Sequence, residues 1–321
     1  MSAQPPLEAA ALVAEYEALR HSVGARRVAR DAVAVTGPEA AAYLQGQCTQ
    51  DIAALVPGGS ADTLVLSPEG KVDVLARVTR RGEDDYVLDT DGGSGDALVA
   101  RLLRFRLRTK VEVTPLAGDM VALRGPGAAA LGGPDAAAGR LVLPFSWGGW
   151  EGVDLLGRAD PVLPDVVVWC GEAAVAACRI EAGIPVMGRE LDERTIPEEA
   201  GLVERTVSFT KGCYTGQELV ARLEARGNRV ARRLRAVVLA GGAGFGPGDP
   251  VVAALARADL VAGDRSVGRC TSAAWCPGVG GPAALAYVHR SVAPDEPVAV
   301  VVEGLDRPLA AVVRALPLVA G

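Results

Sequence analysis

The order of the apolar segments constrains the fold of this chain most, because strands and helices follow one another in two similar rounds. In the first round a strand at 32–37 leads into a helix that Pro38 can open, since proline suits the first helical turn. Three strands within 62–90, a helix at 95–107 and a strand at 110–116 follow. The second round has a strand at 119–125, a helix from Pro126, strands within 141–157 and a helix at 172–183. This repetition predicts two related α+β subdomains.

The chain changes character near residue 230. From Val230 onward, short apolar runs such as 234–242, 249–255 and 297–304 are separated by Gly, Pro and Asp. Evenly spaced short strands of this kind predict a small β-barrel or sandwich. We therefore expect an α+β protein with domains at 1–116, 117–229 and 230–321, the last of them a β-barrel.

Composition excludes several classes of protein. Half of the residues are hydrophobic, 22% are charged and the formal net charge is −6, as in an ordinary soluble globular chain. No apolar run approaches the ~18 residues that span a bilayer. The N-terminal stretch has glutamates where a secretory signal carries Lys or Arg, so we expect a cytoplasmic protein without a membrane partner. Six cysteines without a Cys-x-x-Cys pair, and only two histidines, predict no metal site.

The most unusual segment is 208–218, with the sequence SFTKGCYTGQE. It contains Lys211, one of only three lysines among 33 basic residues, and Lys is not interchangeable with Arg at a tight or reactive site. Thr215 and Glu218 have the spacing of a capping box, which predicts that Thr215 caps a following helix. Cys213 would then lie just outside the helix N-terminus, where the helix dipole and Lys211 favour a thiolate. We predict a reactive Cys213 with Lys211 as its activator; an inert surface cysteine is the alternative that these residues leave open.

The same segment resembles a known family. KGCYTGQE (211–218) is similar to the signature of the YgfZ family of folate-binding proteins, relatives of the aminomethyltransferase of the glycine cleavage system. The resemblance extends over most of the chain. It includes GPEAAAYLQGQCTQD (37–51), SPEGKVDVLARV (67–78), CRIEAGIPVMGREL (178–191) and TIPEEAGL (195–202).

The resemblance implies a monomer with two α+β subdomains around a central folate-binding channel and a C-terminal β-barrel. It implies tetrahydrofolate or a one-carbon derivative as the cofactor, with Glu181 at the pterin ring. A carboxylate suits that position, because it accepts two parallel N–H bonds from a 2-amino-4-oxo-pteridine. Arg179, Gln45, Tyr214 and Gly212 are assigned to the same folate site. A helix-surface charge is the alternative reading of Glu181.

The resemblance also implies a function. Members of the YgfZ family support the assembly or repair of iron–sulfur clusters and the tRNA-modifying enzymes that need them, so iron–sulfur client proteins or assembly factors are expected partners. A folate-dependent aminomethyltransferase or demethylase is the alternative function. A module that has lost its folate is a third.

The aminomethyltransferase alternative is disfavoured by the hairpin at 67–78. In those enzymes the hairpin carries an Asp pair, and the matching positions here are Val74 and Leu75. Asp73 is adjacent, but one residue of offset on a strand points a side chain to the opposite face. The usual acid–base group is therefore expected to be missing.

Two basic stretches are RLLRFRLRTK (101–110) and RGNRVARRLR (226–235). They are either solvated faces or a dock for an anion such as the glutamate tail of a folate. The acidic net charge disfavours nonspecific nucleic-acid binding, so we expect no stable complex with nucleic acid.

Overall fold

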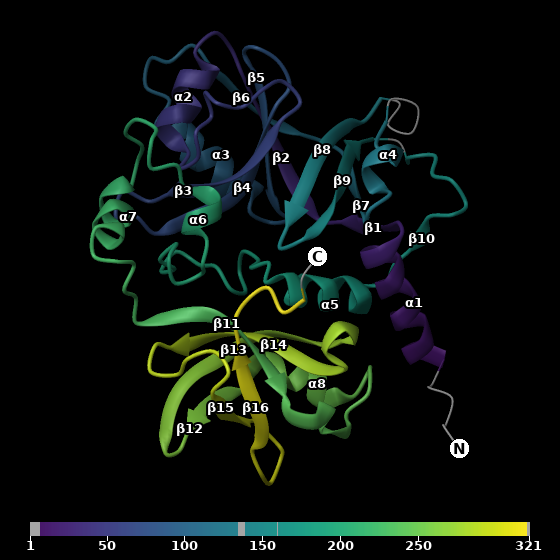
Figure 1. The fold of residues 1–321 in the computed structure, drawn as a ribbon. Coiled ribbons are helices and arrows are strands. Elements are labelled where there is room, and N and C mark those ends of the chain that lie inside the picture. Colours follow the sequence, from purple (N-terminus) through teal and green to yellow (C-terminus); the bar gives the residue numbers. More distant parts are fainter. Residues whose placement is uncertain (1–6, 134–138, 159, 320–321) are drawn as a thin grey trace.

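The computed structural model describes residues 7–133, 139–158 and 160–319 and shows two sheets and a barrel (Figure 1). The first sheet has the order β3 (Ser60–Leu66), β4 (Val72–Arg80), β5 (Asp85–Asp91), β2 (Arg30–Thr36) and β6 (Glu112–Leu116). The second sheet has the order β10 (Val168–Trp169), β1 (Gly24–Val28), β7 (Asp119–Arg124), β9 (Trp150–Gly157) and β8 (Leu141–Trp147). The closed barrel has the order β11 (Arg232–Leu239), β14 (Gly281–His289), β13 (Arg265–Cys276), β12 (Asp259–Ala262), β15 (Pro297–Val301) and β16 (Leu309–Arg314). The predicted α+β fold with a C-terminal β-barrel is confirmed.

Alternation along β4 explains how the first sheet is covered. Its inward apolar side chains belong to the buried cluster beneath α2 (Ala40–Gln47) and α3 (Gly95–Arg104); they are Val74, Ala76 and Val78. Successive strand residues point to opposite faces. Asp73, Leu75 and Arg77 therefore lie on the other face of β4, where they line cavities of the molecule.

The second sheet takes strand β1 from the beginning of the chain. β1 pairs antiparallel with β7, with Ala25 opposite Leu123. The preceding helix α1 (Leu7–His21) packs against α5 (Glu172–Ala182), with Leu19 and Ala177 in one buried cluster. The first sheet is formed within residues 30–116, whereas the second combines β1 with strands from residue 119 onward. The domain limits at 116 and 229 stay predictions.

The barrel has a core of its own, with small and branched side chains such as Val237, Leu260 and Val300. The strand registers shift between Leu260 and Val261 and between Cys270 and Ser272. Bulges of this kind bend strands and help a sheet to close on itself. The short helices α4 (Ala128–Leu131) and α8 (Pro250–Ala254) lie after β7 and after β11.

Helix α5 lies between the barrel and the two sheets (Figure 1). It ends at Gly183, whose φ of 72° is in the left-handed region that glycine adopts without strain. The chain then reaches the short helix α6 (Val203–Thr206), and α7 (Gln217–Glu224) follows. Among the described residues, no helix has both the length and the apolar character needed to cross a membrane.

Candidate functional site

Segments that are far apart in the sequence meet at the loop 208–216. The ammonium group of Lys211 donates hydrogen bonds to the carbonyl oxygens of Cys48 (2.7 Å) and Gln50 (2.8 Å). The backbone N–H of Ser208 donates to the carbonyl of Thr49 at 3.0 Å. The loop is therefore fixed along residues 48–50, which follow helix α2.

Gly216 fixes the end of this loop against the turn at Gly70. It has a φ of 80°, and a Cβ atom there would lie 2.4 Å from the carbonyl oxygen of Ser67 and 3.2 Å from the Cα of Gly70. Helix α7 begins at the next residue, and no side chain caps it. The predicted capping box of Thr215 and Glu218 is wrong, because a left-handed residue at 216 cannot be the first residue of a right-handed helix.

Cys213 is exposed, whereas the other five cysteines are buried. Two of the three N–H donors of Lys211 are taken by backbone carbonyls, and its Nζ lies 5.3 Å from the centroid of the Tyr214 ring. Burial lowers the pKa of Lys211. The geometry makes Lys211 an anchor of the loop, and its role as an activator of Cys213 stays a prediction.

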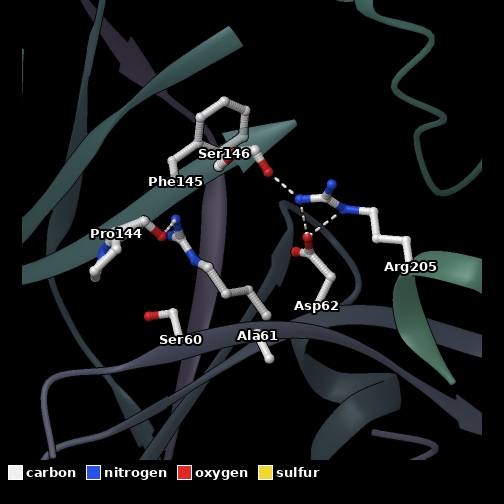
Figure 2. A pocket seen from close by; sticks show the side chains of 8 residues that line it. Ser60, Ala61, Asp62, Pro144, Phe145, Ser146 and Arg205 are labelled. Atoms are coloured by element: carbon white, nitrogen blue, oxygen red, sulfur yellow. Dashed lines mark hydrogen bonds and ion pairs between the residues drawn. The ribbon is translucent and has the colours of Figure 1, made fainter. Parts of the chain in front are cut away.

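A cleft of about 310 Å³ opens between the two sheets (Figure 2). Asp62 on β3 and Phe145 on β8 face each other across it, and Arg205 of α6 reaches between the sheets. The Nε of Arg205 donates to Oδ2 of Asp62 at 2.5 Å, and its Nη2 donates to the carbonyl oxygen of Ser146. A deeper cavity of about 60 Å³ shares Asp62 and Phe145 and is also lined by Trp147.

The cleft combines a carboxylate with aromatic surface. Oδ1 of Asp62 accepts no hydrogen bond from the residues that the structure describes, whereas Oδ2 is held by Arg205. Burial raises the pKa of Asp62, and the charge of Arg205 opposes this shift. The guanidinium carbon of Arg205 lies 4.2 Å from the centroid of the Trp147 ring. Such a site suits a flat heterocycle with N–H donors at one edge.

Buried ion pairs join the two sheets behind the cleft. Arg77 of β4 binds Asp89 of β5 through Nε (2.8 Å) and Asp154 of β9 through Nη1 (2.8 Å). Arg124 of β7 lies 2.8 Å from the second oxygen of Asp154. Burial alone would raise the pKa of Asp154, but the charges of Arg124 and Arg77 outweigh burial and lower it to about 2. The network therefore holds a charged carboxylate in the interior.

Asp73 lines a second cleft, of about 630 Å³, between α3 and the loop 187–193. Arg101 Nε donates to Asp73 Oδ2 at 3.1 Å. Burial raises the pKa of Asp73, and Arg101 opposes the shift. As expected, Asp73 points to the opposite face of the strand from Val74. It lies on the same face as Leu75, because side chains two residues apart along a strand point to the same side. A carboxylate is thus present on the cleft side of this hairpin.

Comparison with known proteins relates these motifs to a family. Residues 232–319 match the glycine cleavage T-protein C-terminal barrel domain. The chain is 27% identical to an aminomethyltransferase of Corynebacterium jeikeium, over 89% of this chain and 84% of that protein. It is 30% identical to the tRNA-modifying protein YgfZ of Klebsiella pneumoniae, over 60% of this chain and 64% of that protein. The chain is thus similar to aminomethyltransferases over most of its length and to YgfZ over 60% of it.

The resemblance to the YgfZ family is thereby confirmed. The fold agrees with that of a glycine cleavage system aminomethyltransferase T from Bartonella henselae, whose crystal structure superposes with a TM-score of 0.82 at 23% identity. The match covers 96% of this chain and 89% of that one. All three parts of the fold therefore have a counterpart in that protein.

Glu181 is buried and held by groups of the protein itself. Its carboxylate accepts hydrogen bonds from the hydroxyl of Tyr16 (2.7 Å), from Nη2 of Arg20 (3.0 Å) and from the backbone N–H of Gly278 (2.9 Å). Burial raises the pKa of Tyr16, and its bond to Glu181 adds to the shift. The alternative of a surface charge is wrong, since Glu181 has no exposed area. Contact with a pterin stays a prediction.

The other four residues assigned to the folate site are Arg179, Gln45, Tyr214 and Gly212, and the first two bond to other parts of the protein. Arg179 Nη1 donates to the carbonyl of Ile184 at 2.8 Å and pairs with Glu190, far from the loop of Cys213 in the sequence. Gln45 ties the turn after α2, with its Oε1 accepting from the N–H of Ile52 at 2.7 Å. Their roles toward a folate stay predictions.

The last two residues assigned to the folate site, Tyr214 and Gly212, flank Cys213 in the loop. Burial raises the pKa of Tyr214 to about 12. Gly212 has open space around it, with no atom within 4 Å of the position of a Cβ, so the turn does not require glycine there. Their contact with a folate stays a prediction.

The basic stretches are partly neutralised. Arg101 is held by Asp73, and Arg232 and Arg233 pair with Glu199 and Glu198. These three cations are therefore not free to dock the tail of a folate. In the described part of the chain, no three His, Cys, Asp or Glu side chains are grouped so that they could hold a metal ion.

Sequence reasoning missed the residues of the cleft between the sheets, chiefly Asp62, Trp147 and Arg205. One signal was available. Asp62, Arg77 and Asp154 are charged residues inside apolar strands, and buried charges require partners. Which partners they find depends on how the two sheets face each other.

Proposed function

We propose that the protein binds a reduced folate, tetrahydrofolate or a one-carbon derivative, in the cleft between its two sheets. The observation that carries the proposal is that Oδ1 of Asp62 accepts no hydrogen bond from the described residues and lies in a cleft lined by Phe145 and continued by Trp147. A pterin offers two parallel N–H donors and a flat ring, which a carboxylate and aromatic walls can bind. The relation to YgfZ and to aminomethyltransferases supports a folate as the ligand.

Its biological role is of the YgfZ type, with Cys213 as the reactive group. This role supports the assembly or repair of iron–sulfur clusters and the tRNA modification that depends on them. Two observations support it: Cys213 is the exposed one of six cysteines, and the Klebsiella pneumoniae relative is a tRNA-modifying protein. Cys213→Ser is expected to abolish complementation in cells while leaving the circular dichroism spectrum unchanged. Full complementation by this variant would contradict the role of the thiol.

Two carboxylates compete for the pterin. Glu181 is the one that the family resemblance implies, but three donors of the protein already occupy it. A pterin could bind there only if Tyr16, Arg20 or Gly278 gave way, and each lost hydrogen bond would leave a buried donor unpaired. Oδ1 of Asp62 accepts no hydrogen bond from the described residues, and Asp62 lines an open cleft. The geometry favours Asp62 as the pterin carboxylate and Glu181 as a structural residue that joins α1 and α5 to the barrel.

Calorimetric titration with 5-formyl-tetrahydrofolate tests this assignment. Wild type should bind saturably, and Asp62→Asn should bind about ten- to a hundredfold more weakly, the effect of leaving a charged hydrogen-bonding group without its partner. Glu181→Gln should retain the affinity of wild type if it remains folded. The reverse order of the two variants would move the pterin to Glu181. No binding by wild type would remove folate from the function.

A one-carbon transferase is a second candidate, and Asp73 is the observation that favours it. The carboxylate lies in a cleft beside Arg101, and burial raises its pKa, which suits a group that exchanges protons. Formation of 5,10-methylene-tetrahydrofolate from an aminomethyl donor, abolished in Asp73→Asn, would establish the transferase. No turnover by the folate-saturated protein would exclude it.

A further inference from the structure

The guanidinium group of Arg205 resembles the edge of a pterin, because both are planar and carry N–H donors. Its Nε donates a hydrogen bond to Oδ2 of Asp62, and Nη2 forms an ion pair with the same oxygen. It also covers the ring of Trp147 at 4.2 Å. A 2-amino-4-oxo-pteridine would direct parallel N–H groups at the same carboxylate and would stack on the same kind of surface.

The two cannot both be satisfied at Asp62. Arg205 occupies Oδ2 of Asp62 through the hydrogen bond from Nε and the ion pair of Nη2. A pterin that binds through both oxygens of Asp62 must therefore displace at least one bond from Arg205.

Arg205 is also tied to the segment that anchors the cysteine loop. Its carbonyl oxygen accepts a hydrogen bond from Nε2 of Gln50 at 3.2 Å, and the next residue, Thr206, accepts from Oγ1 of Thr49 at 2.6 Å. Lys211 bonds to the carbonyl of the same Gln50. These hydrogen bonds connect α6 to residues 49–50, and the bond of Lys211 connects Gln50 to the loop that carries Cys213. A shift of α6 therefore also moves this loop.

We infer that Arg205 is a positioning residue that couples the two sites: it occupies the pterin position in the free protein, and its displacement by folate loosens the loop of Cys213. The inference rests on the proposed folate site. The side chain of Arg205 bonds to both sheets, through Asp62 of β3 and Ser146 of β8 (Figure 2). Its release therefore also opens the entrance of the cleft.

The test follows the rate at which iodoacetamide alkylates Cys213, read by mass spectrometry, with and without saturating 5-formyl-tetrahydrofolate. In wild type the folate should raise the rate about three- to tenfold, as expected when one hydrogen bond between neutral groups is lost. Arg205→Ala and Asp62→Asn should show the higher rate without folate. Arg205→Ala should still bind folate in the titration but show no further response. Arg81→Ala, which removes the exposed pair with Asp85, is the matched control and should behave as wild type.

The outcomes separate the inference from the folate site. An unchanged rate in both Arg205→Ala and Asp62→Asn would overturn the coupling, whether or not folate binds. Saturable folate binding without any effect on the alkylation of wild-type Cys213 would also overturn it while leaving the proposed function intact. If Arg205→Ala is unfolded by circular dichroism, Arg205→Lys replaces it. A lysine cannot donate two N–H groups in a planar fork, so it too should show the higher rate.

Discussion

Asp62 determines how ligand binding should depend on pH. Burial raises the pKa of this carboxyl above its ordinary value, so it takes up a proton at a higher pH than an exposed Asp with a pKa of ~3.9. The protonated form loses an acceptor for the pterin. The affinity for 5-formyl-tetrahydrofolate should therefore fall as the pH is lowered toward the raised pKa, and Asp62→Asn should show no such fall. Titrations at a series of pH values check this; an equal pH dependence in both proteins would contradict it.

Cys213 should be the one cysteine that reacts in the native protein. The other five thiols are buried, and burial raises the pKa of Cys48 and Cys170 to about 11. Alkylation followed by mass spectrometry should find one modified cysteine under native conditions and six in denaturant. Modification of Cys170 or Cys48 at the rate of Cys213 would show that the loop is not the exposed site.

The contact between the loop 208–216 and the turn at 67–70 depends on one glycine. Gly216→Ala places a Cβ on a left-handed backbone and 2.4 Å from a carbonyl oxygen, so it should destabilise the protein by about 1–3 kcal/mol. Gly212→Ala, four residues earlier in an open part of the same loop, should change the free energy of unfolding by less than about 1 kcal/mol. Urea denaturation of both variants gives the comparison. Equal losses would show that the contact at Gly216 is not what holds the loop.

Whole elements could be predicted from the sequence better than their ends and partners. The strands of the barrel and the helix at 172–183 follow from periodicity, because burial of one face imposes it. The start of α7 could not be predicted, since Thr215 and Glu218 have a good capping pattern and only the tertiary contact of Gly216 overrides it. Lys211 could be singled out because lysine is rare in this chain, but its partners are backbone carbonyls 161 and 163 residues away, which no local pattern encodes.

For the whole molecule, the ion pairs of Asp154 contribute to the contact between the two sheets. Removing the charge in Asp154→Asn leaves Arg124 without its buried carboxylate partner, whereas Arg77 keeps Asp89, so the loss of stability at pH 7 should be about 3–5 kcal/mol. The folded-state pKa of about 2 lies below the unfolded value of ~3.9, so this stabilisation is present above ~3.9 and is lost as the pH falls toward 2. The difference between variant and wild type in urea denaturation should shrink from pH 7 to pH 3. Asp85→Asn, which removes the exposed pair with Arg81, is the control and should cost at most about 1 kcal/mol.

The sites of the molecule show the same limit of sequence reasoning at a larger scale. The loop of Cys213 could be found because its residues are contiguous. The cleft could not, because Asp62, Trp147 and Arg205 come from three distant segments and meet only when both sheets and α6 are in place. Glu181 shows the opposite case. Its motif can be recognised in the sequence, whereas its hydrogen bonds with Tyr16 and Gly278, which favour a structural role, appear only in the folded protein.

A crystal structure of the protein with 5-formyl-tetrahydrofolate would show whether a reduced folate binds between the two sheets at Asp62. We expect a pterin ring beside Phe145 and Trp147, with its 2-amino edge on the carboxylate of Asp62 and the side chain of Arg205 moved aside. A pterin bound at Glu181, with Asp62 still paired to Arg205, would contradict it.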